Sequence, residues 1–295
     1  MNPQTAVSPL RYPGGKQKLY LLVKLIIRKA ALKRCIYVEP FAGGAGVALA
    51  LLFDGTVDSV VINDFDKAVA SIWKAILLES DRFIEKIFNV PLTIAEWKKQ
   101  QNIYTSSSRY SFDFGFASFY LNRTNHSGIL KGGPIGGFDQ SNPADTMSAR
   151  FNRVELAKKI AAIKEHKDKI KCYNQNAKVF ICNQLPQIGK KAFIYFDPPY
   201  YNKGRRLYKD YFVEEDHKEL ARLIRNYSIA PWIVSYDDVP AIREMYSRLT
   251  ARTFTLSYSL ANSGHGQEIM FFKDKTLCPS DAELKSMKVD IANWR

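Results

Sequence analysis

Short apolar runs alternate with amphipathic stretches along the first part of the chain. Apolar positions recur at helical spacing within Lys16–Ala31, and a short buried strand is predicted at Cys35–Val38. A glycine-rich turn then leads into the helix-forming run Val47–Phe53, and a second apolar strand, Ser59–Ile62, ends at Asp64. Strand, glycine turn, helix, strand and acid form the first half of a parallel α/β nucleotide-binding unit.

The pattern changes after residue 66 and resumes further along the chain. Residues 67–160 combine helical stretches with a polar, glycine-rich segment, Asn122–Asp145, which predicts loops or hairpins. The later part predicts a strand at Phe193–Phe196, a helix at Glu214–Tyr227, a strand at Trp232–Ser235, a helix at Val239–Leu249, and strands at Thr253–Ser259 and Glu268–Lys273. We therefore expect an α/β protein whose sheet domain comprises residues 1–66 and 161–295, interrupted by an inserted, mainly helical domain of residues 67–160.

Composition narrows the class of protein. In 295 residues, hydrophobic side chains make up 46%, which is enough to form a core, and 43 Lys and Arg against 29 Asp and Glu give a net charge of +14. Such an excess favours a polyanionic partner, although it can also serve solubility alone. Four cysteines without a C-x-x-C and four histidines without metal-ligand spacing argue against a disulfide framework and a structural metal. No apolar run is long enough to cross a bilayer and no leader pattern is evident, so we expect a cytoplasmic protein.

The glycine turn indicates a cofactor site. Gly43, Gly44 and Gly46 lie where a strand passes into a helix, and there the backbone can approach a ligand closely. No Lys-Ser/Thr pair follows, which excludes a P-loop. Asp64 ends the next strand about 20 residues after Gly43, where an acid accepts hydrogen bonds from ribose hydroxyls. Asp64 could instead cap the next helix, but together the two features favour a nucleoside cofactor.

The tetrapeptide Asp197-Pro198-Pro199-Tyr200 is the sharpest chemical signal. It follows a buried strand, at the edge where open parallel sheets bind ligands. An acidic side chain, the Pro198 carbonyl and the Tyr200 ring would suit a planar base that carries an exocyclic amine. Two acceptors on that amine would direct its lone pair toward an electrophile, Asp197 would stabilise the developing positive charge, and Tyr200 would stack on the base. The alternative is a strand-ending acid whose prolines merely stop the sheet.

Five motifs occur in a fixed order: Arg11–Lys16, Glu39–Gly44, Asn63-Asp64, Phe119–Thr124 and Asp197–Tyr200. Together they resemble the Dam-like (D12 class, α group) adenine-specific DNA methyltransferases. The resemblance implies a Rossmann-like sheet that uses S-adenosyl-L-methionine, with residues 67–160 as an inserted target-recognition domain. Two departures stand out: Ala45 replaces the second glycine of the turn, and His126-Ser127-Gly128 stands where members of the family often carry an aromatic residue followed by Asn-Gly.

The resemblance also implies specific roles. The reaction would transfer a methyl group from S-adenosyl-L-methionine to the N6 amine of a flipped adenine in double-stranded DNA. The predicted catalytic residues are Asp197, Pro198, Pro199 and Tyr200. The predicted cofactor-binding residues are Tyr12, Lys16, Pro40, Phe41, Gly43, Asp64 and Asp197. The residues predicted to contact DNA, mostly basic, are Arg123, His126, Ser127, Lys131, Lys203, Arg205 and Arg206.

Two other functions stay open at this point. An RNA adenine methyltransferase is one, because Asp-Pro-Pro-Tyr also occurs in enzymes that act on ribosomal RNA. A non-catalytic DNA-binding protein that keeps the methyltransferase fold is the other. The expected partners are double-stranded DNA and a cognate restriction endonuclease acting on the same site, with no metal and no membrane. The expected location is the cytoplasm, in association with the nucleoid, as for a bacterial or phage-type protein.

Overall fold

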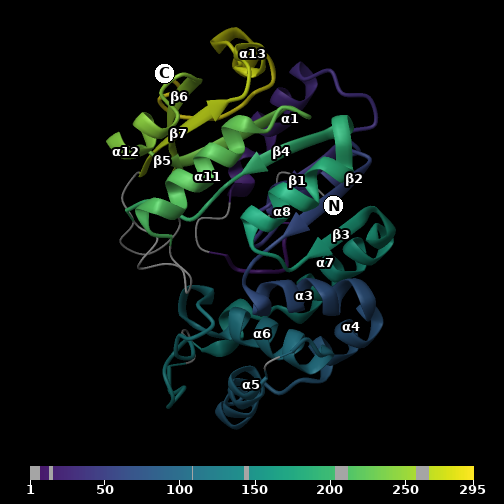
Figure 1. The fold of residues 1–295 in the computed structure, drawn as a ribbon. Helices are drawn as coiled ribbons and strands as arrows, with labels where there is room; N and C mark the ends of the chain where they lie inside the picture. The colour runs from purple at the N-terminus through teal and green to yellow at the C-terminus, as the bar shows by residue number, and fades with distance from the viewer. Residues whose placement is uncertain (1–6, 13–15, 108, 143–145, 203–211, 257–265) are drawn as a thin grey trace.

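A seven-stranded sheet forms the centre of the part of the chain that the structure describes (Figure 1). The computed structural model describes residues 7–12, 16–107, 109–142, 146–202, 212–256 and 266–295. The strand order is β3-β2-β1-β4-β5-β7-β6. The strands are β1 (Ile36–Glu39), β2 (Ser59–Asn63), β3 (Ile170–Tyr173), β4 (Ala192–Phe196), β5 (Trp232–Asp237), β6 (Thr250–Leu256) and β7 (Gly266–Phe272). The first five are parallel, whereas β7 runs antiparallel to β5 and β6. The expected α/β fold class is confirmed.

The order of the strands reverses between β1 and β4. The chain leaves β1 for β2 on one side and returns to pair β4 with β1 on the other side. Ligands of doubly wound sheets bind outside the carboxyl ends of the strands at such a reversal. The register pairs Val38 with Ile194. Because the strands are parallel, Glu39 and Asp197 follow this pair at the same edge of the sheet.

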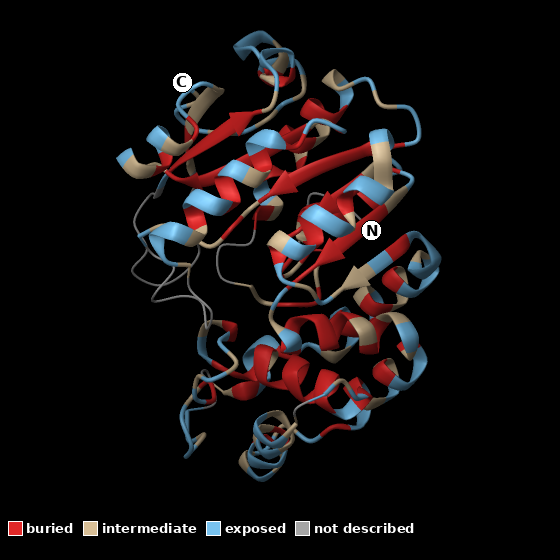
Figure 2. Ribbon diagram, viewed as in Figure 1, coloured by how far each residue is buried: buried red, intermediate tan, exposed pale blue. Residues whose placement is uncertain are grey.

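Two helical layers bury the two faces of the sheet, so the strands lie in the interior (Figure 2). One apolar cluster contains α1 (Tyr20–Lys29) and α2 (Gly46–Phe53). The other contains α8 (Ala177–Asn183), α11 (Glu214–Asn226) and α12 (Pro240–Met245). Short helices α9 (Leu185–Ile188) and α13 (Asp281–Ser286) complete this part. Burial on both faces explains why the central strands are apolar throughout rather than alternating.

Five further helices gather beside the β3 edge of the sheet (Figure 1). They are α3 (Lys67–Leu78), α4 (Ser80–Asn89), α5 (Ile94–Ser106), α6 (Phe112–Thr124) and α7 (Arg153–Glu165). α3 and α6 approach closely at Gly115, where an added Cβ would lie 2.5 Å from the Ser71 carbonyl oxygen. The predicted domain boundary after residue 160 falls inside α7, and the division into two domains stays a prediction.

Several element boundaries, and one strand, differ from the expectation based on the apolar pattern. The predicted loop from Asn122 begins only after α6 ends at Thr124, whose buried hydroxyl bonds back to the Tyr120 carbonyl at 2.8 Å. The predicted helix to Leu249 ends at Met245, and β6 begins at Thr250. The strand β3 was not predicted from the apolar pattern, because its four residues, one of them the exposed Lys171, lack a clear apolar run. The end of the predicted strand beyond Leu256 lies outside the described residues.

Candidate active site at the carboxyl edge of the sheet

Asp197 stands where β4 leaves the core. All five residues of β4 are buried, whereas the Asp197 side chain keeps 24% of its surface exposed. Its Oδ1 accepts a hydrogen bond from the Ser235 hydroxyl at 3.0 Å, and Ser235 also lies 2.8 Å from the Tyr195 hydroxyl. The predicted catalytic acid is therefore oriented by the neighbouring strand and still reaches the surface.

Lys16 lies beside Asp197 and is held by two further side chains. Its ammonium group donates to the Tyr200 hydroxyl at 2.8 Å and to Glu268, and it lies 3.6 Å from Asp197 Oδ1. The Tyr200 hydroxyl in turn donates to the second oxygen of Glu268. Lys16, Tyr200 and Glu268 are all buried. The structure thus places the predicted cofactor-site lysine among the predicted catalytic residues.

Burial and neighbouring charges shift the pKa values of this group. Burial lowers the pKa of Lys16, but the nearby Asp197 and Glu268 carboxylates outweigh it, so the pKa stands well above its usual value. Burial raises the pKa of Asp197 to about 6, with Lys16 lowering it and Glu268 raising it. Asp197 is consequently mostly ionised at neutral pH, and a small fall in pH begins to protonate it.

Asp237 fixes the backbone that follows the tetrapeptide. Its two carboxylate oxygens accept hydrogen bonds from the backbone N–H groups of Tyr201, at 2.8 Å, and Asn202, at 3.0 Å. Pro198 is buried and Pro199 is half-buried. These contacts hold the chain leaving the predicted catalytic residues in one conformation. The predicted DNA contacts Lys203, Arg205 and Arg206 follow immediately and lie outside the described residues.

The glycine turn after β1 is held from three directions. Gly43 has a φ of +47°, and a Cβ at this position would lie 2.6 Å from the Tyr12 ring. Its N–H donates to Asp64 Oδ2 at 2.8 Å, and its carbonyl accepts from the Trp73 indole at 2.9 Å. Only glycine satisfies both the backbone conformation and the close ring contact. Tyr12, Gly43 and Asp64, predicted to bind cofactor, are thereby brought together.

Asp64 is a nearly buried acid with both oxygens in use. Besides Gly43, it accepts from the Asp66 N–H at 2.9 Å through Oδ1. Burial raises the pKa of Asp64 to about 7, while the two backbone N–H groups lower it. The helix α3 is capped by Asp66, whose side chain accepts from the Ala68 N–H, so Asp64 is not its N-cap. The adjacent Phe65 leaves 54% of its surface exposed, an aromatic face beside the acid that the sequence had not singled out.

Pro40 and Phe41 extend the same edge. The Pro40 carbonyl accepts from the Asn63 side-chain amide at 3.0 Å, which ties the end of β1 to the end of β2. Phe41 is half-buried and meets Phe212 edge to face, with ring centroids 6.2 Å apart. Both predicted cofactor residues therefore border the Gly43 turn.

Four polar residues of this edge were not among the predicted site residues. They are Glu39, Ser235, Asp237 and Glu268. Glu39 is buried and accepts from the Tyr37 hydroxyl at 2.9 Å, and burial raises its pKa to about 8. Acids at the ends of otherwise apolar strands were the sequence signal for Glu39, Asp237 and Glu268. Ser235 carried no such signal, because a serine in a strand is common on either face.

The N-terminal segment joins the glycine-rich loop to the cofactor side. The Arg11 N–H donates to Asn122 Oδ1 at 2.8 Å, and the Asn122 amide donates back to the Arg11 carbonyl at 2.6 Å. Gly128 lies so close that an added Cβ would be 2.6 Å from the same carbonyl. Since Tyr12 follows Arg11 and packs on Gly43, the loop that carries His126 and Ser127 lies beside the predicted cofactor residues.

The predicted DNA-contacting residues differ in their exposure. His126 and Lys131 are exposed, and Ser127 is half-buried with a φ of 53°. Arg123 donates to the carbonyl oxygens of Arg150 and Pro9. Burial, with the neighbouring arginines, lowers the pKa of Arg123 to about 10. Arg123 thus fastens the N-terminal segment and the segment before α7 to α6, and its contact with DNA stays a prediction.

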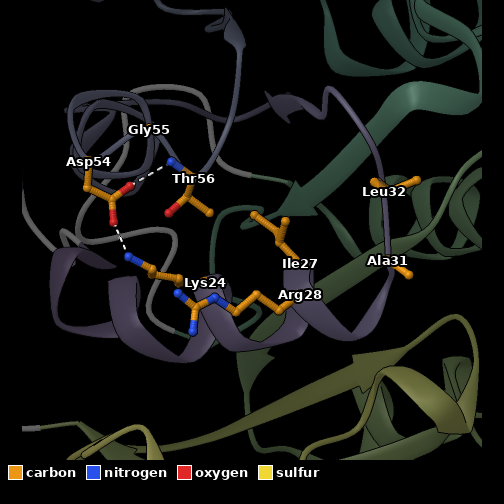
Figure 3. A pocket seen from close by; sticks show the side chains of 8 residues that line it. All are labelled: Lys24, Ile27, Arg28, Ala31, Leu32, Asp54, Gly55 and Thr56. Atoms are coloured by element: carbon orange, nitrogen blue, oxygen red, sulfur yellow. Dashed lines mark hydrogen bonds and ion pairs between the residues drawn. The ribbon is translucent and has the colours of Figure 1, made fainter.

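A hollow lies between α1 and the turn that follows α2 (Figure 3). It has a volume of about 320 Å³ and is lined by Lys24, Ile27, Arg28, Ala31, Leu32, Asp54, Gly55 and Thr56. These residues precede β1 and β2, so the hollow faces the amino ends of the strands. Lys24 pairs there with Asp54. This hollow is separate from the candidate active site.

The described residues also bear on metals and membranes. Nowhere among them do three or more His, Cys, Asp or Glu side chains cluster as a metal site would require. No helix within the described ranges has the length and apolar character needed to cross a bilayer.

Comparisons with known proteins identify the family to which the chain belongs. The model of the D12 class N6 adenine-specific DNA methyltransferases matches residues 12–259. The chain is similar to the type II methyltransferase M.MjaIII of Methanocaldococcus jannaschii, at 24% identity over 238 residues that cover 73% of this chain and 78% of that one.

Solved structures give weaker likenesses. The rRNA methyltransferase AviRa of Streptomyces viridochromogenes matches with a TM-score of 0.39 and 12% identity, over 87% of this chain and 86% of that one. A putative class I S-adenosylmethionine-dependent methyltransferase of Listeria monocytogenes matches with a TM-score of 0.39 and 11% identity, over 90% and 62%. At these TM-scores the likenesses carry no argument about substrate.

Proposed function

Because the chain belongs to the D12 class N6 adenine-specific DNA methyltransferases, we propose that it methylates a flipped adenine with S-adenosyl-L-methionine as the donor. The family establishes the reaction on adenine in DNA, and the alternatives of an RNA enzyme and a non-catalytic binding protein give way to it. The donor, the flipping of the base and the role of each residue are the proposal. Two further expectations stay predictions: a cognate restriction endonuclease and an association with the nucleoid.

The residues around Gly43 fit a nucleoside-containing donor. Asp64 uses one lone pair of each oxygen for a backbone N–H, which leaves acceptor capacity for two ribose hydroxyls. Tyr12 packs against Gly43, and Phe65, the residue after Asp64, leaves an exposed aromatic ring. Gly43 keeps a side chain out of the space next to Tyr12. When bound, S-adenosyl-L-methionine supplies an electrophilic methyl group on a sulfonium centre.

Asp197 and its neighbours would prepare the adenine amine. The Asp197 carboxylate and the Pro198 carbonyl would accept the two amine N–H groups, which directs the nitrogen lone pair away from the ring. Positive charge that develops on the amine would be stabilised by Asp197, which is fixed by Ser235 before the reaction begins. Tyr200 would contact the base with its ring while its hydroxyl stays bonded to Glu268.

A base inside a duplex does not reach this edge of the sheet, so the adenine would have to leave the stack. The loop that carries His126 and Ser127 lies beside Arg11, and in this proposal it would fill the gap in the duplex while Lys131 contacts the DNA backbone. The excess positive charge of the chain supports the same substrate.

The partly exposed Asp197 beside buried Lys16 is the observation that carries this mechanism. Its test is methylation of adenine-unmethylated plasmid with tritiated S-adenosyl-L-methionine, using wild type and Asp197→Asn. We expect label on N6 of adenine with wild type and a loss of about three orders of magnitude in kcat with the variant, as for removal of a main charge stabiliser. Asp58→Asn, an exposed acid that pairs with Arg34 before β2, is the matched control and should retain activity. No label on plasmid adenine with wild type, or full activity of Asp197→Asn, would refute the proposal.

A further inference from the structure

Glu268 joins the two halves of the candidate site. It is 1% exposed and lies near the start of β7. Because β7 runs antiparallel to β5, Glu268 pairs with Asp237 and lies at the carboxyl edge of the parallel strands. One carboxylate oxygen accepts from Lys16 and the other from the Tyr200 hydroxyl. A buried carboxylate is thus shared by a cation on the cofactor side and an aromatic residue on the base side.

The position of Lys16 depends on this carboxylate. Lys16 bonds directly to Glu268, whereas its 3.6 Å separation from Asp197 exceeds hydrogen-bond distance. Without Glu268, the buried ammonium group would find its nearest carboxylate in Asp197, and the desolvation of an unpaired cation favours that move. A direct pair with Lys16 would occupy an oxygen that the adenine amine requires and would weaken it as an acceptor.

We propose that Glu268 is a positioning residue that keeps Lys16 away from Asp197 and fixes the hydroxyl of Tyr200. The proposal rests on the proposed function, since it concerns how Asp197 is kept available for the amine. It assigns a role in the reaction to a residue 71 positions beyond the catalytic acid, on a strand with no other charged group in the site.

The electrostatic surroundings of Asp197 give this role a measurable consequence. The titratable and polar groups that face it from the packed elements are Lys16, Tyr37, Glu39, Tyr195, Tyr200, Ser235, Tyr236 and Glu268. Glu268 raises the pKa of Asp197 and Lys16 lowers it. Loss of the Glu268 charge removes the repulsion that raises the pKa of Asp197, and it also lets Lys16 approach Asp197. Both changes lower the pKa of Asp197.

The test compares Glu268→Gln with wild type in single-turnover methylation across pH 5 to 8.5. Glu268→Gln should lower kcat by about tenfold or more, as expected for losing a supporting contact in a preorganised site. Affinity for S-adenosyl-L-methionine should fall by less than kcat does, because Asp64 and Tyr12 are untouched and only Lys16 among the predicted cofactor residues moves. The acid limb of kcat should move to lower pH. Glu244→Gln, an exposed glutamate on α12, is the matched control and should reproduce the wild-type profile.

Glu268→Asp serves where Glu268→Gln does not fold, as judged by thermal melting. The aspartate keeps the negative charge, but its side chain is one methylene shorter and no longer reaches Lys16. We therefore expect kcat to fall, and the acid limb to move to lower pH by less than in Glu268→Gln. A folded variant with wild-type kcat, or with a lower kcat and an unmoved acid limb, would overturn the proposal. Absence of adenine labelling by wild type in the same assay would instead refute the proposed function, which separates the two failures.

Discussion

The Asp64 carboxylate and the Gly43 backbone N–H form a 2.8 Å hydrogen bond between the end of β2 and the turn after β1. The same carboxylate bonds to the Asp66 N–H, so one side chain shapes both loops that border the predicted donor site. This dual role explains why an acid at this position organises the site even before a ligand binds.

Asp64→Asn should therefore weaken donor binding more than catalysis. The amide keeps one acceptor oxygen, so one backbone contact or one ribose contact is lost, and we expect the Kd for S-adenosyl-L-methionine to rise about tenfold, equivalent to about 1.4 kcal/mol. Isothermal titration calorimetry measures it. Asp66→Asn, which retains a good N-cap two residues away, should leave the Kd unchanged. An unaltered Kd in Asp64→Asn would remove the ribose role.

The pH dependence of methylation should reveal Asp197. The pKa of this acid is about 6, and the ionised form is the one that stabilises positive charge on the amine. As pH falls through about 6, the carboxylate is protonated and kcat should decline toward tenfold per pH unit. Single-turnover rates from pH 5 to 8.5 measure this limb, and a flat profile over that range would contradict the role.

Glu39 should make the folded state less stable as pH rises. Burial raises its pKa to about 8, so the folded protein binds more protons than the unfolded chain between the usual glutamate value and pH 8, and stability is lost as pH increases through this window. Glu39→Gln imitates the protonated acid. Its unfolding free energy should match wild type near pH 4 and exceed it by a growing margin from about pH 5 to pH 8. Glu85 is exposed, so the stability of Glu85→Gln should follow that of wild type at every pH. Equal pH dependence of wild type and Glu39→Gln would disprove the raised pKa of Glu39.

Ala45 adopts a left-handed conformation, with φ 47° and ψ 33°, immediately before α2. The left-handed conformation destabilises the folded state by about 1–2 kcal/mol for alanine but not for glycine. Glycine has more conformational freedom in the unfolded chain, which reduces the gain by about 0.5–1 kcal/mol. Ala45→Gly should thus raise the free energy of unfolding by up to about 1 kcal/mol, measured by urea denaturation. Ala48→Gly, inside α2, should lower it by about 1 kcal/mol or more. A destabilising Ala45→Gly would show that this residue is not strained.

Lys131 tests the glycine-rich loop as a DNA contact. The side chain is exposed, and a phosphate contact there would release about one counterion on binding. Lys131→Ala should weaken DNA binding and reduce the slope of log K against log salt by about 0.9. Fluorescence anisotropy at several salt concentrations measures the slope. Lys158→Ala, on the surface of α7, should leave it unchanged, and an unchanged slope in Lys131→Ala would exclude the contact.

Local patterns in the sequence determined much of this protein. The glycine turn, the strand-ending Asp64 and the Asp197–Tyr200 tetrapeptide depend on neighbours within a few residues, so their chemistry can be read along the chain. The apolar runs likewise predicted most of the sheet. Short elements such as β3 could not be predicted from apolar runs, because four residues with an exposed lysine give too little periodicity.

Tertiary structure alone decided which distant groups meet. Lys16 and Glu268 are 252 residues apart, and they meet because β7 enters the sheet antiparallel and brings its first residues to the carboxyl edge. Arg123 likewise donates hydrogen bonds to backbone carbonyls that only the packing of α6 brings close to it. Strand direction and helix packing follow from burial summed over the whole chain, and no local run of residues encodes them.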